Sequence, residues 1–124
     1  MSFDSILQSI ADDCKGVIGI ALMENDGIAI AQVQGAAGAR GALSVDITSA
    51  GIEFGRIIAD VAKAADALGG GEASETVVSL ARFSLVFHRV DADMVLVLAL
   101  APDGNLGKAR YLIRRNLVAI RHEL

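Results

Sequence analysis

The order of short apolar segments constrains this chain more than any single motif. Three such segments, residues 76–82, 84–90 and 94–101, follow one another with links too short for anything but antiparallel turns. Upstream, segments 17–24 and 28–34 flank Asp26 and Gly27, a pair that tolerates the backbone of a tight hairpin. The sequence therefore predicts five strands in a mostly antiparallel sheet.

Two of these segments are apolar throughout, and this places them within the sheet. Residues 17–23 and 94–100 contain no charged or amide side chain, as expected of strands covered on both faces. The other three segments include polar residues: Gln32, Gln34, Ser79, Arg82, His88 and Arg89. The economical strand order is second, first, fifth, fourth, third, which leaves the third strand at an exposed edge.

Helical periodicity accounts for most of the remaining chain. Residues 1–15 and the closing segment are amphipathic, and residues 46–68 carry apolar side chains at helical spacing. The sheet-facing set predicted for residues 46–68 is Ile47, Ala50, Phe54, Ile57, Ile58, Val61, Ala65 and Leu68, and the inward set of the last helix is Leu106, Ala109, Ile113, Leu117, Ile120 and Leu124. We expect one α+β domain over residues 1–124, an α/β sandwich with the middle helix on one face and the first and last helices on the other.

The single middle helix suggests a second copy. Five strands make a sheet roughly 20 Å wide, whereas one helix covers about 10 Å, and each interior glycine of a helix costs about 1 kcal/mol relative to alanine. The third strand also lacks the proline or lysine that protects exposed edges. We therefore expect a homodimer whose interface includes Gly51, Gly55, Ile58, Ala62, Thr76, Val77, Val78 and Ser79. The alternative is that the glycines permit close approach to the chain's own sheet and a loop hides the edge.

Composition excludes several classes of function. Tryptophan is absent and aromatic residues make up 4% of the chain, so platforms for stacking nucleic-acid bases are missing. The first 15 residues are amphipathic and carry acidic side chains, so we expect no signal peptide, and no apolar run reaches the roughly 20 residues of a membrane span. The one cysteine, Cys14, shares a helical face with apolar residues and is expected to be a packed core thiol. We expect a cytoplasmic protein.

Chemical motifs are weak. The glycine-rich segment 35–41 lies between a strand and a helix, but it matches neither a P-loop nor a dinucleotide fingerprint and is interpreted as a connector. His88 and His122 have no metal-ligand spacing, and no nucleophile and base converge, so we expect no metal, no cofactor and no enzyme. In the last helix, Arg110, Arg114 and Arg121 form a basic edge, with Lys108 and Arg115 farther round. This edge either meets an acidic partner or anionic lipid, or is simply solvated.

The pattern as a whole resembles a known family. It combines an opening Phe3-x-x-Ile6-Leu7 helix, a Val17-Ile18-Gly19-Ile20-Ala21 strand, an Asp26-Gly27 turn, and a Met94-Val95-Leu96-Val97 strand before a basic closing helix. This succession resembles the Roadblock family over essentially the whole chain, and profilin-like and longin folds share much of the layout. The glycine and alanine segment 35–42 and the triple glycine at 69–71 are not marks of the family.

The resemblance implies a function. Roadblock proteins form homodimers with paired middle helices and regulate or scaffold Ras-like small GTPases without being GTPases themselves. By position, the partner surface would be the outer face of the middle helix: Ile52, Glu53, Arg56, Ala59, Asp60 and Lys63. Arg40 and Arg56 are the conceivable arginine fingers, but Arg56 has Glu53 and Asp60 at pairing distance along a helix, which favours positioning of the GTPase's own residues. The alternatives are a scaffold indifferent to nucleotide state and a sensor with a small-ligand cavity between sheet and helix.

Overall fold

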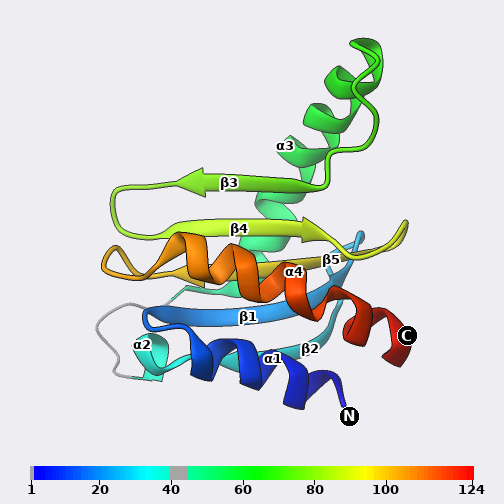
Figure 1. Ribbon diagram of the computed structural model, residues 1–124. Helices are drawn as coiled ribbons and strands as arrows, with labels where there is room; N and C mark the ends of the chain where they lie inside the picture. Colours follow the sequence, from blue (N-terminus) through cyan, green and yellow to red (C-terminus); the bar gives the residue numbers. More distant parts are fainter. Residues whose placement is uncertain (1, 40–44) are drawn as a thin grey trace.

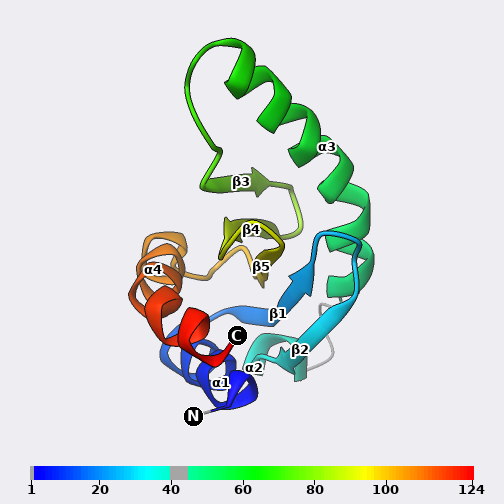
Figure 2. The same cartoon turned by 90° about the vertical axis from the view of Figure 1, so that its right-hand side faces the viewer.

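The computed structural model describes residues 2–39 and 45–124 and shows a two-faced sheet with helices on both sides (Figure 1). Helix α3 lies on one face, and α1 and α4 lie together on the other (Figure 2). The elements in chain order are α1 (Phe3–Asp13), β1 (Val17–Glu24), β2 (Ala29–Gln34), α2 (Ala36–Ala39), α3 (Ile47–Ala67), β3 (Glu75–Ser79), β4 (Ser84–Arg89), β5 (Met94–Leu100) and α4 (Leu106–Glu123).

The sheet has the order β2-β1-β5-β4-β3, and its neighbouring strands are all antiparallel. The predicted fold class and strand order are therefore confirmed. β1 and β5 are central, as their unbroken apolar sequences predicted, because they are buried on both faces at nearly every position. The turn between β1 and β2 places Gly27 at a positive φ of 94°, which is the conformation that favours glycine.

Two cores lie on the two faces of the sheet. The larger core packs α1 and α4 against residues of β1, β5 and β4, and Cys14 is buried within it, as predicted. The smaller core lies beneath α3 and is lined by Ile47 together with short side chains such as Ala21 and Ala99. In α4, Leu112 is buried although it was not assigned to the inward set, and Leu124 was wrongly assigned, because the last residue of the chain lies half exposed beyond the core.

Helix α3 begins at the N-cap Asp46, whose side chain accepts a hydrogen bond from the backbone N–H of Ser49. Its 21 residues span about 32 Å, longer than the sheet is wide. The helix therefore diverges from the sheet and passes beyond the edge strand β3 (Figures 1 and 2).

This divergence corrects the predicted packing of α3. Ile57, Val61 and Leu68 were assigned to the sheet, but they are 55%, 41% and 86% exposed, because beyond Phe54 only the side of the helix that carries Ile58 stays on the core. Ala50, Phe54 and Ile58 do pack on the core. The idea that one helix leaves the sheet bare also needs correction, since β1, β4 and β5 are well buried on this face in the single chain. What lies uncovered is the distal half of α3 itself.

The segment after β2 is more ordered than a plain connector. It forms the short helix α2, and the backbone N–H of Gly35 donates to the carbonyl oxygen of Ile18 at 2.9 Å. A Cβ on Gly35 would lie 2.0 Å from the Val17 carbonyl oxygen, and one on Gly38 would lie 2.3 Å from that of Ile18. These glycines are needed because the chain folds back tightly on β1. The rest of the predicted connector, including Arg40, lies outside the described residues.

Two further features concern the whole chain. Within residues 2–39 and 45–124, no helix combines the length and apolarity that crossing a membrane requires. The beginning of α1 and the end of α4 lie near each other, on the opposite side of the sheet from α3, in both views (Figures 1 and 2).

Candidate partner-binding surface

The outer face of α3 carries the six residues predicted to meet a partner. Their positions in the helix place them on one side, and all six are exposed, although Ala59 also lines the groove between α3 and the sheet: Ile52, Glu53, Arg56, Ala59, Asp60 and Lys63. Ile52 also reaches the β1–β2 turn, because a Cβ on Gly27 would meet its side chain at 2.6 Å. The outer face is thus a continuous mixed surface of apolar and charged side chains, anchored at one end on a hairpin.

The expected charge pairing on this face is wrong. The structure shows no ion pair or hydrogen bond joining the side chain of Arg56 to Glu53 or Asp60, although all three lie in the described part of α3. Exposed helical pairs contribute only a few tenths of a kcal/mol, so solvation of the free side chains competes successfully. The guanidinium of Arg56 is therefore available to a partner, and the argument against its acting as a finger loses its basis.

The residues predicted for a dimer interface line a groove between α3 and the end of the sheet. Gly51, Gly55, Ile58 and Ala62 contribute from α3, and Thr76 contributes from β3. The two glycines differ, however. A Cβ on Gly51 would come within 2.5 Å of the Met23 thioether, whereas a Cβ on Gly55 would meet nothing within 4 Å. Close packing at Gly51 therefore has a reason within the single chain, and Gly55 faces open space.

The remaining interface residues, Val77, Val78 and Ser79, lie on β3. This strand pairs with β4 on one side, and no other strand of the described chain pairs with it, so its outer backbone groups are free. Val78 packs on the smaller core, while Val77 and Ser79 are exposed. The edge predicted from the sequence is present, and no described loop pairs with it.

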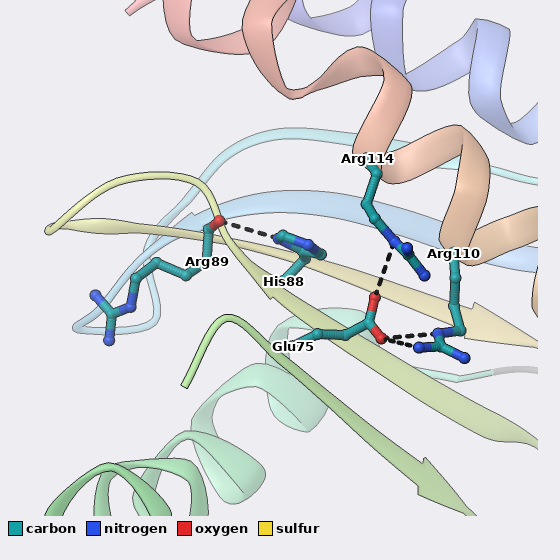
Figure 3. Close-up of polar contacts among 5 residues, drawn as sticks. All are labelled: Glu75, His88, Arg89, Arg110 and Arg114. Atoms are coloured by element: carbon teal, nitrogen blue, oxygen red, sulfur yellow. Dashed lines mark hydrogen bonds and ion pairs between the residues drawn. The ribbon is translucent and has the colours of Figure 1, made fainter. Parts of the chain in front are cut away.

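A polar cluster fixes the beginning of β3 to α4 (Figure 3). The carboxylate of Glu75 is largely buried and accepts a hydrogen bond of 2.7 Å from Arg110 Nε, and Arg110 Nη2 lies 2.6 Å from the same oxygen. Arg114 Nε lies 3.9 Å from the other carboxylate oxygen. Two cations of the basic edge therefore have an intramolecular role, and Arg121 has another, because its Nε donates to the Val90 carbonyl oxygen.

His88 lies beside this cluster on β4, opposite Glu75 in the strand register. Its ring is buried, and Nδ1 lies 3.0 Å from the Arg89 carbonyl oxygen (Figure 3). No group of three potential metal-ligating side chains occurs among residues 2–39 and 45–124. His88 is therefore a core histidine with a backbone partner.

Sequence reasoning missed the roles of Glu75 and Arg89. Glu75 joins β3 to α4, which is distant in the chain, whereas Arg89 holds the adjacent β4–β5 turn through Asp91 and Ala92. The only signal available was that each interrupts an otherwise apolar strand end. That signal marks a polar residue near a boundary but does not identify its partner.

Comparisons with known proteins show which solved structures share this architecture. No protein-family profile matches the chain, and no curated protein matches it either. Among solved structures, the chain is similar to MglC from Myxococcus xanthus, with 32% identity over 100% of both chains and a TM-score of 0.68. It is also similar to a Roadblock/LC7 domain from Streptomyces avermitilis, with 14% identity, coverage of 98% and 96%, and a TM-score of 0.80. The gliding protein MglB from Thermus thermophilus matches with 17% identity, coverage of 96% of this chain and 85% of that one, and a TM-score of 0.83.

The chain has an antiparallel sheet of order β2-β1-β5-β4-β3, with one long helix on one face and two helices on the other. This is the architecture of Roadblock/LC7 domains. The likeness to MglC extends over both full chains at an identity that goes beyond a shared fold. The chain belongs to the Roadblock family.

Proposed function

We propose that the chain is a noncatalytic, homodimeric regulator of a Ras-like small GTPase. The observation that carries the proposal is the overhang of α3: its distal apolar residues lie exposed beside the unpaired edge of β3. A second copy related by a two-fold axis would pair the β3 edges and cover these residues. The outer faces of the two helices would then remain exposed for the GTPase.

The character of the outer face supports this assignment. It combines the apolar side chains of Ile52 and Ala59 with the free cations Arg56 and Lys63, a mixture suited to a protein partner. An unpaired arginine could also approach the nucleotide of a bound GTPase and offset charge on the transferred phosphoryl group. Regulation by positioning the GTPase's own residues is the alternative mechanism, and it would be excluded if Arg56→Ala abolished stimulation of hydrolysis while leaving binding intact.

A second candidate is an assembly subunit that binds partners without regard to nucleotide. The chain is 32% identical to MglC but only 17% and 20% identical to the MglB structures, so a role like that of MglB does not follow from the comparison. The chain also covers all of MglC but 85% and 83% of those MglB chains. Its partners can therefore differ from those of MglB.

The test uses a Ras-like GTPase from the same cell, loaded with GDP or with a non-hydrolysable GTP analogue. Co-elution in one nucleotide state and altered GTP hydrolysis would support regulation, whereas equal binding in both states would favour the assembly role. Arg56→Ala should weaken binding if the outer face of α3 is used. Arg115→Ala is the matched control, because Arg115 is exposed on α4 across the sheet. Absence of any complex would remove the leading proposal.

The dimer is tested separately. Sedimentation should give a mass twice that of the 12.8 kDa chain. Val77→Lys, which places a charge on the free edge of β3, should shift the protein toward the single-chain mass. A wild-type protein that sediments as one chain at high concentration would contradict the dimer without bearing on GTPase binding.

A further inference from the structure

Helix α4 has an exposed side whose cations have no partner within the chain. Residues 104–122 carry five cations and no acid. Three of these cations are used internally, by Glu75 and by a carbonyl oxygen of the β4–β5 turn, as described above. Lys108 and Arg115 are exposed, and no ion pair joins either of them to another described residue. Two charges on the outward side of α4 are therefore available to a partner.

Exposed apolar side chains accompany these two cations. Tyr111 and Val118 are 58% and 60% exposed. Their spacing of three and four residues from Lys108 and Arg115 places all four side chains along one line of the helix. Tyrosine and arginine are enriched where protein interfaces are buried, so this line has the composition of a protein-binding surface.

Helix α1 lies beside α4 and carries the opposite charge. Its exposed side presents Asp4, Asp12 and Asp13, and its sequence contains no cation. The two helices run antiparallel next to each other (Figures 1 and 2), and Cys14 Sγ lies 3.7 Å from the Asn105 carbonyl oxygen, so the end of α1 is level with the start of α4. This face of the molecule is therefore divided into an acidic half and a basic half.

The division of charge selects among partners. An anionic membrane, or a uniformly acidic protein, would attract α4 but repel the carboxylates of α1 beside it. A second copy of this chain carries both charges. When two copies meet face to face about a two-fold axis that runs between the helices and parallel to them, each α1 lies on the α4 of the other copy. An axis across the helices would place α1 on α1 and oppose like charges.

From these observations we propose that the face formed by α1 and α4 is a self-complementary surface that binds a second copy of this chain. An axis parallel to the helices keeps their levels, so Asp12 of one copy would lie opposite Lys108 of the other. Tyr111 and Val118 would be covered in the same contact. The face lies across the sheet from α3 (Figure 2), so this contact adds to the proposed homodimer and does not depend on GTPase binding.

The test is sedimentation of the purified chain at low and at high ionic strength. Exposed ion pairs are weak and screened by salt, because the Debye length falls from about 30 Å at about 0.01 M salt to about 3 Å at about 1 M. We expect species heavier than two chains at low salt and their dissociation to the homodimer at high salt. Val77→Lys, which disrupts the contact at the edge of β3, should leave a pair of chains that separates on addition of salt. Masses that do not change with salt would overturn the proposal.

An exchange of charges identifies the contact. Lys108→Asp and Asp12→Lys should each weaken the association at low salt about tenfold, because the two-fold axis repeats the altered pair and like charges then meet. The double variant that combines the two substitutions should restore the association. Lys63→Asp makes the same change of charge on the exposed outer face of α3 and should leave the association intact. Failure of the double variant to recover what the single variants lose would contradict the pairing of α1 with α4.

Vesicles that contain phosphatidylserine test the competing partner at the same low salt. We expect the wild-type chain and Lys108→Asp to be equally unbound, because the carboxylates of α1 oppose an anionic surface. Binding of the wild-type chain to these vesicles that is lost in Lys108→Asp would assign the cations of α4 to a membrane surface and overturn the proposal.

Discussion

The two interior glycines of α3 should respond in opposite ways to the same substitution. Gly55→Ala adds a methyl group where nothing lies within 4 Å, so the single chain gains only the helix propensity of alanine, about 1 kcal/mol. For 124 residues, an unfolding entropy of about 2.1 cal/mol/K per residue converts this gain into a rise in Tm of about 4 °C. This rise in Tm is expected only if no second chain covers Gly55.

Gly51→Ala has the same propensity gain but a different contact. Its methyl group would lie 2.5 Å from Sδ and Cε of Met23, which is 1% exposed and can shift only by disturbing the smaller core. Overpacking of this kind costs about 1–3 kcal/mol, so the net effect should be a loss of up to about 2 kcal/mol. The two variants should therefore differ by about 1–3 kcal/mol in the free energy of unfolding.

The assay is urea unfolding followed by circular dichroism, repeated over a range of protein concentrations. Dilution separates the single chain from any dimer, because only the stability of a dimer depends on concentration. At high concentration, Gly55→Ala should lose its advantage if a second copy packs on this groove. Destabilisation of the dilute chain by Gly55→Ala, or stabilisation by Gly51→Ala, would refute the packing described for α3.

Three further predictions concern single residues. Burial raises the pKa of the Cys14 thiol, so Ellman's reagent should modify it slowly in the folded protein at pH 8 and fast in denaturant. Modification of the folded protein at the rate seen in denaturant would contradict the burial of Cys14. Hydrogen bonds from the Ser49 hydroxyl and backbone lower the pKa of Asp46, so its stabilising effect is present above the pKa of the unfolded chain and is lost as pH falls through the folded value. The stability difference between wild type and Asp46→Ala should accordingly shrink on acidification, and a constant difference would argue against the cap. Gly38→Ala should destabilise the chain by about 1–3 kcal/mol, because its methyl group would press on the Ile18 carbonyl oxygen. Gly69→Ala is the comparison: its methyl group would meet nothing within 4 Å, but its φ is positive, so any loss there reports backbone strain instead of a steric contact.

The sheet could be predicted from the sequence because its signals are local. The uninterrupted apolar runs of β1 and β5 identify the central strands, and the short links after Ser79 and Arg89 leave only antiparallel connections. The strand order follows from those two facts. The same reasoning failed for α3, because periodicity gives the side of a helix that is apolar but not the point at which the helix leaves the sheet.

The candidate site was only partly predictable for the same reason. The outer face of α3 follows from helical geometry, and its six residues do lie together on it. The contact between Gly51 and Met23 and the pairing of Glu75 with Arg110 depend on segments distant in the chain. No spacing rule within one segment reports on such contacts, whereas a three-dimensional arrangement shows them directly.

The position of the two chain ends has a practical consequence. The beginning of α1 and the end of α4 lie on the side of the sheet opposite α3 (Figure 2). A fluorophore or an affinity handle attached to either end would therefore be shielded from the groove and from the outer face of α3. Immobilised through such a handle, the protein would present those surfaces to the solution, so surface-based binding measurements can be made without altering a single residue of the regions under test.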